Sequence, residues 1–275
     1  MMKSWITSLN TSDNNSGVAS ETVKVLIIMG QSNIDGRNLL VDLPADITNP
    51  SSLVKLYNSG WQDWNSTKPP GTGRGDSSAY SSDIIATQRL ATSLGETIYV
   101  VKVSQGGTHF YKDTNDINQI DADWNIASTG FYDLYPKLIN SINNAENYIK
   151  ASGKKMEVVG LWCDIFESDS IVSTKAQLNI DFKDFINAIR TRVGKPNLPI
   201  IHRAVSINQL GYVVQDIIDL QTEFATQGHP NYIENYNLIP STDITMQVDN
   251  VHLDSASTEI IADRVLPILT NIYQN

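Results

Sequence analysis

Apolar residues along this chain gather in short continuous runs, and most runs are followed by a longer segment with apolar residues every three or four positions. The runs are rich in valine and isoleucine and lack polar alternation, as is typical of strands buried on both faces of a parallel sheet. They predict strands at 23–29, 97–103, 156–163 and 199–205, and a short strand at 232–238. Residues 53–57 fit another strand or an edge hairpin.

Segments with helical spacing alternate with these runs. Helices are expected at 81–94, 131–151, 175–193, 212–226 and 258–273. Glycines 95, 153 and 194 lie where helices commonly end. A strand and helix alternation with a period of roughly forty residues predicts a parallel sheet with helices on both faces. We therefore expect one α/β domain over residues 21–275.

Two segments show neither the apolar runs of strands nor the spacing of helices. Residues 1–20 are polar, which predicts a linker or N-terminal arm. They lack the apolar core of a signal peptide, so we expect a cytoplasmic protein or a part of a larger extracellular or virion assembly. Residues 58–79 contain two tryptophans and a Pro-Pro pair and are interpreted as a long loop. Trp61 in this segment either anchors the loop or stacks on a sugar.

Composition narrows the function classes. The 275 residues have an ordinary hydrophobic fraction of 41%. A formal charge of -10 argues against nucleic-acid or anionic-membrane partners, because both need a basic surface. No apolar segment approaches the ~20 residues of a membrane span. Cys163 is the single cysteine, which excludes an intrachain disulfide, and its place at a strand end suggests burial.

The strand at 23–29 ends in a chemically useful group, Gly-Gln-Ser-Asn at 30–33. Gly30 permits a sharp turn where a Cβ would clash. Ser32 then lies just past the carboxyl end of a central strand, where open α/β sheets bind their ligands. We predict that Ser32 is a nucleophile, which requires a base, an acid that orients the base, and donors for an oxyanion.

Histidine is the usual base for a serine nucleophile, and the chain has four histidines. His202 falls inside a predicted strand, and neither His109 nor His229 has an orienting acid close in sequence. His252 lies just before the last predicted helix, with Asp249 three residues upstream. Asp249 can accept a hydrogen bond from the His252 ring and fix its tautomer. We therefore predict His252 as the base and Asp249 as its partner.

Two backbone segments are candidate oxyanion donors. One is the N–H of Ser32, and the other is the Gly106-Gly107 pair after the second central strand, because glycine lets N–H groups approach a ligand closely. As a phosphate-binding motif, Gly-Gly-Thr at 106–108 is weak, because no Gly-Lys-Ser/Thr follows it.

Together, Gly-Gln-Ser-Asn at 30–33, Gly-Gly-Thr at 106–108 and Asp-x-x-His at 249–252 resemble the SGNH hydrolase superfamily. Within it, they resemble the sialate O-acetylesterase and acetylxylan esterase-like branch (carbohydrate esterase family 6). The resemblance implies a flavodoxin-like three-layer α/β/α sandwich that hydrolyses acyl esters without a metal or other cofactor. It assigns Ser32 as nucleophile, His252 as base, Asp249 as its partner, and Ser32 and Gly107 as backbone oxyanion donors. The α/β-hydrolase signature Gly-x-Ser-x-Gly is absent.

The chain departs from this branch in one block. Where relatives carry Trp-x-Gln-Gly-Glu-x-Asp, this chain has Asp-Ile-Phe at 164–166 in place of Gln-Gly, although Glu-Ser-Asp at 167–169 fits the end. The missing glutamine would be a third oxyanion donor, whereas a carboxylate at Asp164 would repel an oxyanion. Either the hole has two donors or another side chain donates. The candidates are Asn33, Gln105 and His109.

Other polar residues of these motifs are expected to contact substrate or to brace the loops of the site. They are Gln31, Gln105, Thr108, His109, Glu167 and Asp169. Carboxylates at 164, 167 and 169 would also suit a glycosidase acid and base or a hard metal ion, but neither reading explains the serine and histidine motifs. We expect Glu167 and Asp169 to brace loops, and we expect no metal site.

The sequence thus predicts a serine esterase that removes O-acetyl groups from a saccharide or polysaccharide through an acetyl-enzyme. Two alternatives stay open. One is a lipase- or thioesterase-like SGNH hydrolase, and the other is a carbohydrate-binding module with weakened catalysis in a larger protein, such as a phage tail. The sequence indicates no oligomeric state.

Overall fold

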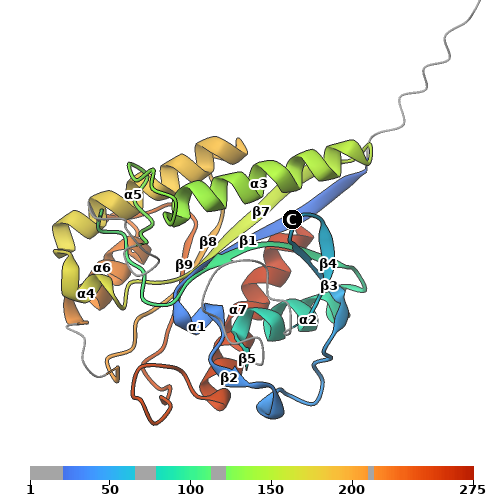
Figure 1. The fold of residues 1–275 in the computed structure, drawn as a ribbon. Coiled ribbons are helices and arrows are strands. Elements are labelled where there is room, and N and C mark those ends of the chain that lie inside the picture. Colours follow the sequence, from blue (N-terminus) through green and yellow to red (C-terminus); the bar gives the residue numbers. More distant parts are fainter. Residues whose placement is uncertain (1–20, 66–78, 113–121, 210–213) are drawn as a thin grey trace, which may run out of the picture.

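The computed structural model describes residues 21–65, 79–112, 122–209 and 214–275. The expected arm at 1–20 lies outside these ranges. A seven-stranded sheet with the order β4-β3-β6-β1-β7-β8-β9 forms the centre of the fold (Figure 1). Its strands are β1 (Thr22–Gly30), β3 (Ser51–Tyr57), β4 (Trp61–Trp64), β6 (Ile98–Ser104), β7 (Lys155–Asp164), β8 (Ile200–Arg203) and β9 (Tyr236–Ile239). Every neighbouring pair is parallel except β3 with β4.

The continuous apolar run of β1 reflects its central place in the sheet. Val25 and Ile27 pack into the apolar cluster on one face, and Leu26 and Ile28 pack into the cluster on the other. All four side chains are fully buried. Because each such burial contributes about 1.5–3 kcal/mol, a polar residue at any of these positions would be costly.

Helices cover both faces of the sheet, as predicted (Figure 1). On one face lie α3 (Leu134–Ala151), α5 (Lys175–Val193) and α6 (Gln215–Ala225). On the other, α2 (Ser82–Leu94) packs against α7 (Ser255–Gln274). The predicted three-layer α/β/α sandwich is therefore confirmed. None of the helices in the described ranges has the length and apolar character that crossing a bilayer requires.

The sheet places a crevice at the end of β1. The chain runs from β1 outward to β3, returns to β6 on one side of β1, and then continues to β7 on the other side. Such a reversal of strand order opens a ligand site at the carboxyl ends of the strands. The short helix α1 (Ser32–Asp35) begins there (Figure 1). Other short elements are β2 (Asn38–Leu39), η1 (Leu40–Asp42), β5 (Ala79–Tyr80) and α4 (Asp169–Val172).

The interpretation of 58–79 as one long loop was wrong for the tryptophan segment. Trp61–Trp64 forms β4, which pairs antiparallel with β3 as an edge hairpin. The turn is tight, because Asn58 N donates to Gly60 O at 2.8 Å and both Ser59 and Gly60 have positive φ. Residues 66–78 lie outside the described ranges. The expected strand at 232–238 begins later, at Tyr236.

Candidate active site

Backbone hydrogen bonds at the end of β1 fix the position of the predicted nucleophile. Gly30 O accepts from Gln105 N at 3.0 Å, and Gln31 N donates to Asp164 O at 2.8 Å. A Cβ on Gly30 would lie 2.1 Å from Asp164 O, so only glycine fits between the neighbouring strands. Ser32 follows as the first residue of α1.

The structure brings Ser32, His252 and Asp249 together from opposite ends of the described chain. His252 Nε2 lies 2.9 Å from Ser32 Oγ, and His252 Nδ1 lies 2.6 Å from Asp249 Oδ2. The second carboxylate oxygen of Asp249 accepts from the backbone N–H groups of Val251 and His252 at 2.9 and 3.0 Å. With the Nδ1–H donated to Asp249, Nε2 is free to accept the hydroxyl proton of Ser32.

The surroundings of Asp249 favour its charged form. Partial burial raises its pKa, but the N–H groups of His252 and Val251 and the His252 ring outweigh burial, and the pKa lies below its ordinary value. Its side chain is 44% exposed, and that of His252 is 21% exposed. The carboxylate is therefore ionised at neutral pH and holds the ring in one orientation.

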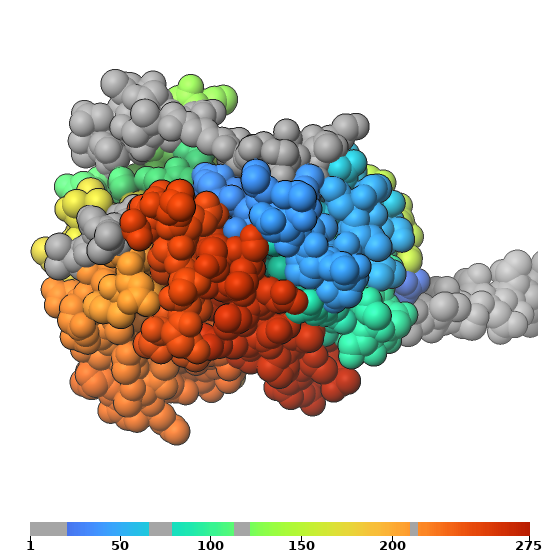
Figure 2. Space-filling model, turned by 90° about the horizontal axis from the view of Figure 1, so that it is seen from below, coloured from blue at the N-terminus to red at the C-terminus, as the bar shows by residue number. Residues whose placement is uncertain are grey.

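A pocket of about 300 Å³ opens beside these three residues. Its lining residues are Gln31, Ser32, Asn33, Arg37, Gly106, Gly107, Glu167, Ser168, Gln209, Val251 and His252. Figure 2 shows the orange-red surface near residue 250 directly beside the blue surface that follows β1. The pocket thus lies between the first and last parts of the described fold.

Gly106 and Gly107 bring the backbone after β6 close to the nucleophile. A Cβ on Gly106 would lie 3.3 Å from Ser32 Cβ and 2.6 Å from Arg37 Nη2. Gly107 has a φ of +78° and open space where a Cβ would point. Both glycines line the pocket, so the structure brings this predicted donor segment to the nucleophile.

The candidate third oxyanion donors take different places. Asn33 lines the pocket, donates from Nδ2 to Glu167 Oε1 at 3.0 Å and accepts from Leu253 N at 3.0 Å. Gln105 and His109 do not line the pocket. His109 Nδ1 instead lies 2.9 Å from the Tyr111 carbonyl oxygen. Of the three, the structure brings only Asn33 to the pocket.

The remaining motif residues fix the loop after β6. Gln31 Nε2 donates to the Thr108 carbonyl, and Thr108 Oγ1 donates to Gln105 O at 2.9 Å and accepts from Trp124 Nε1 at 3.0 Å. Asp169 Oδ1 accepts from the backbone N–H of Phe110 at 2.6 Å, and burial raises the pKa of Asp169 to about 8. Thr108 and Asp169 therefore act as braces and do not line the pocket.

Asp164, which was expected to repel an oxyanion, is not brought to the pocket. Its side chain is fully buried and does not line the pocket. Both of its oxygens accept from the Arg203 guanidinium, at 2.7 to 3.0 Å. Arg203 also donates to Glu167. Burial raises the pKa of Asp164, whereas Arg203 offsets burial at Glu167 and lowers the pKa of that carboxyl.

Five residues at or near the pocket were not predicted from the sequence, among them Ser168 and Val251, which line it. Arg37 lines the pocket and is held by Gly36 O at 2.8 Å and by Asp35 at 3.3 Å. Gln209 lines it too, and its Nε2 donates to Val251 O at 2.8 Å. Arg203 lies behind it, fully buried. No sequence signal pointed to Arg203, which falls inside the predicted strand at 199–205.

Trp61 and Cys163 lie away from the pocket. The Trp61 ring packs edge-on against Tyr57 and Tyr99, and Tyr99 is near the amino end of β6, opposite the end that carries the site. Trp61 therefore anchors the β3–β4 hairpin and is not brought to the predicted sugar site. Cys163 is buried, and burial raises the pKa of its thiol.

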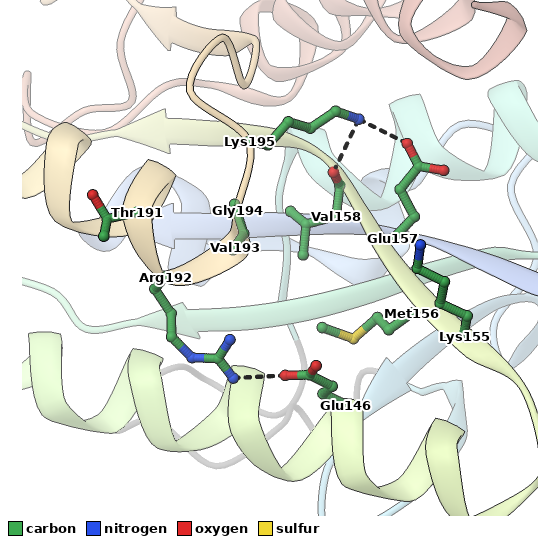
Figure 3. Close-up of a pocket in the computed structure, with 10 residues that line it drawn as sticks. All are labelled: Glu146, Lys155, Met156, Glu157, Val158, Thr191, Arg192, Val193, Gly194 and Lys195. Carbon is green, nitrogen blue, oxygen red and sulfur yellow. Dashed lines mark hydrogen bonds and ion pairs between the residues drawn. The ribbon is translucent and has the colours of Figure 1, made fainter.

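A second concave region lies at the amino end of β7, between α3 and α5, with a volume of about 450 Å³ (Figure 3). Two of its basic residues form ion pairs: Arg192 lies 2.7 Å from Glu146, and Lys195 lies 2.8 Å from Glu157. It contains no serine, cysteine or histidine. Within the described residues, no group of three or more His, Cys, Asp or Glu side chains is placed to hold a metal ion.

Comparison with protein families identifies the chain. The model of the family described as "carbohydrate esterase, sialic acid-specific acetylesterase" matches residues 22–268. The chain belongs to this family. Membership supports carbohydrate esterase function. A comparison with curated proteins gives no match.

Solved structures share the fold at low sequence identity. A protein from Arabidopsis thaliana has a TM-score of 0.68 at 17% identity, over 92% of this chain and 98% of that one. NanS has a TM-score of 0.63 at 14% identity, over 94% and 99%. A carbohydrate acetylesterase from Xanthomonas citri has a TM-score of 0.60 at 12% identity, over 91% of this chain and 57% of that one. These three solved structures thus share the α/β architecture of this chain.

Proposed function

We propose that this carbohydrate esterase removes O-acetyl groups from a saccharide through a Ser-His-Asp triad and an acetyl-enzyme. The hydrogen-bonded series from Asp249 to His252 to Ser32 carries the proposal. It ends at a pocket that Gly106 and Gly107 line, and the backbone N–H of Gly107 is one of the donors that we assign to the oxyanion. That combination of nucleophile, base, orienting acid and donors is the one that acyl transfer requires.

The reaction follows from the positions of these groups. His252 Nε2 takes the proton of Ser32 Oγ as Oγ attacks the acetyl carbonyl carbon. The carbonyl oxygen becomes an oxyanion, which the N–H groups of Ser32 and Gly107 stabilise. Collapse breaks the bond to the sugar oxygen, which takes the proton from His252. A water molecule, deprotonated by His252, then attacks the acetyl-enzyme and releases acetate, and His252 returns the proton to Ser32.

Two backbone donors, with or without the remaining Nδ2–H of Asn33, make up the oxyanion hole. The position that relatives fill with glutamine is here taken by Asp164, whose carboxylate is occupied by Arg203. Because one donor is worth on the order of 3 kcal/mol of transition-state stabilisation, we expect a working but slower esterase if only the two backbone groups act.

The pocket chemistry favours a short acyl group on a polar alcohol. Among the described residues that line it, Val251 is the single apolar side chain, and the others are glycines or polar groups. A fatty acyl chain would need an apolar groove, because its affinity comes from burying methylenes. Saccharide hydroxyls, in contrast, can exchange hydrogen bonds with Arg37, Ser168 and Gln209, which face the same space. We therefore prefer the acetylesterase to the lipase-like alternative.

Hydrolysis of p-nitrophenyl esters tests the proposal. Wild type should hydrolyse the acetyl ester, and Ser32→Ala should lose at least 10³-fold in kcat (~4 kcal/mol) while folding normally. Ser152→Ala, near the far end of α3, serves as the matched control and should keep wild-type activity. Absence of activity in folded wild type would favour the binding-module alternative. A preference for long acyl chains would favour the lipase-like one.

A further inference from the structure

Behind the pocket lies a buried charged cluster that the proposed reaction does not use directly. Arg203, at the end of β8, and Asp164, at the end of β7, are fully buried, and Glu167 is 3% exposed. The guanidinium contacts both oxygens of Asp164 and Oε1 of Glu167. Burying three charged side chains is expensive, so the cluster needs a reason beyond stability.

The carboxylate of Glu167 connects the buried cluster to the site through hydrogen bonds. Glu167 Oε1, which accepts from Arg203, also accepts from Asn33 Nδ2 at 3.0 Å. An ionised carboxylate can only accept, so it turns the amide group of Asn33 toward itself and leaves Oδ1 pointing the other way. There Oδ1 accepts from the backbone N–H of Leu253 at 3.0 Å.

Leu253 directly follows His252, and Asn33 directly follows Ser32. The Asn33 side chain is therefore a short strut between the segment that carries the nucleophile and the segment that carries the base. Its length and direction are set by Glu167, whose Oε1 is in turn held by Arg203. Movements of about 1 Å in such a pair change rates by about 10²-fold.

We propose that Arg203 is a positioning residue, which sets the distance between Ser32 and His252 through Glu167 and Asn33. The proposal rests on the proposed function of Ser32 and His252. Arg203 lies on β8, two strands away from β1, and would still control the geometry of Ser32 and His252.

Asp164 provides a matched control, because it shares the same guanidinium but is not part of this series. Its carboxylate makes no hydrogen bond to Asn33, and its oxygens accept from Arg203. Removing its charge changes the formal charge of the cluster by one unit, as does removing the charge of Glu167. The strut, however, stays intact.

The first experiment compares Glu167→Met, Glu167→Gln and Asp164→Asn in kcat and KM for p-nitrophenyl acetate. Glu167→Met removes the acceptor and should lower kcat at least about tenfold with little change in KM. Glu167→Gln keeps an Oε1 that can accept from both Arg203 and Asn33, so its kcat should stay within about threefold of wild type. Asp164→Asn should behave like Glu167→Gln.

The second experiment asks whether Arg203 acts through Glu167. Arg203→Lys should lower kcat in wild type but add no further loss in the Glu167→Met background. Should Arg203→Lys not fold, Arg203→Met with Asp164→Asn keeps the net charge of the cluster and serves the same comparison. Amide hydrogen exchange at Leu253 gives a readout that does not depend on catalysis, and it should speed up in Glu167→Met relative to the Val265 amide in α7.

Three results would overturn the proposal. They are wild-type kcat in Glu167→Met, equal losses of kcat in Glu167→Met and Asp164→Asn, and additive losses from Arg203→Lys and Glu167→Met. Failure of the proposed function is distinguishable from these, because Ser32→Ala would then keep wild-type activity while the exchange rate at Leu253 still responded to Glu167→Met.

Discussion

Gly106 and Gly107 are neighbours in the pocket, yet the physical reasons for glycine differ between them. At Gly106 a Cβ would meet the Arg37 guanidinium at 2.6 Å, so the absence of a side chain makes room for a cation beside the nucleophile. At Gly107 there is space for a Cβ, but a φ of +78° disfavours any other residue by roughly 1–2 kcal/mol. Gly106 thus leaves space for the Arg37 side chain, whereas Gly107 allows a backbone conformation that other residues disfavour.

These differences predict two kinetic outcomes. Gly106→Ala should push aside the flexible end of Arg37 and raise KM for an acetylated saccharide, with a smaller effect on p-nitrophenyl acetate. Gly107→Ala should shift a backbone donor and lower kcat for both esters. The loss of transition-state stabilisation should reach at most the ~3 kcal/mol that one oxyanion donor supplies. Measurement of kcat and KM on both esters checks this. Unchanged kcat in Gly107→Ala would contradict its role as a donor.

Asp249 is expected to contribute less to kcat than a buried acid would. Asp249→Asn removes the charge that orients His252, so kcat should fall by about 10²-fold, toward the lower end of the range for general base catalysis. Its side chain is 44% exposed, so water can replace part of its effect on the ring. His252→Ala is the comparison, and it should lose more activity than Asp249→Asn. A larger loss in Asp249→Asn would mean that the acid does more than orient.

Prediction from sequence worked for residues whose partners are local or whose motif lies at a strand end. The placement of Ser32 followed from an apolar run and a glycine, and Asp249 lies only three residues from His252. Arg203 was missed because its importance depends on register. Cys163 on β7 pairs with His202 on β8, so Asp164 and Arg203 both end their strands at the same level. Nothing in the one-dimensional pattern gives that alignment.

At the scale of elements, α4 and the loop after β6 are joined by one buried acid. Asp169, the first residue of α4, accepts from the backbone N–H of Phe110. Burial raises its pKa to about 8, against about 4 in an unfolded chain. The folded protein therefore holds an extra proton between these values, and this group stabilises the fold at low pH.

The contribution of Asp169 should be lost as pH rises toward and through 8. Asp169→Asn has no proton to lose, and its Oδ1 can still accept from Phe110 N. The free energy of unfolding of wild type, minus that of Asp169→Asn, should fall by several kcal/mol between about pH 5 and about pH 9. Urea unfolding at a series of pH values measures the difference. A constant difference would contradict the raised pKa.

The elements that sequence reasoning missed or misread are the short ones. β4 has four residues, with only Trp64 buried, so it shows neither alternation nor an apolar run. Helices α1 and α4 have four residues each and cover no face of the sheet. Periodicity needs two or more turns or several alternations before it can be read. The long helices and central strands satisfy that condition, and they were predicted to within a few residues.

At the scale of the whole molecule, an aromatic cluster connects one helix layer to the site. Phe182 on α5 packs against Phe110, Phe166 and Phe224, and Phe166 has a φ of 104°, which is strained for a residue with a side chain. Phe166 precedes Glu167, so the packed rings hold this backbone turn in place. The family resemblance of this block implies a Gln-Gly pair here, and in this chain aromatic packing holds the turn without a glycine.

Removal of the Phe182 ring should therefore affect both stability and activity. Phe182→Ala should lower the free energy of unfolding by about 3–5 kcal/mol, as for other large buried aromatics. It should also lower kcat, because Phe166 and the turn before Glu167 lose their support. Leu178→Ala, in the same helix and apolar cluster, is the control and should cost stability with little change in kcat. Equal effects on kcat would contradict a specific link.

Ser32 follows the first strand of the sheet, and His252 precedes the last helix of the fold, at a sequence separation of 220. On a ribosome, the nucleophile would emerge long before its base, and β6, β7 and β8 must be in place before the two can meet. Partly synthesised chains and chains clipped ahead of His252 would therefore be inert toward esters. Ester hydrolysis by this protein is thus a direct assay of complete folding, and it would suit screens for refolding conditions.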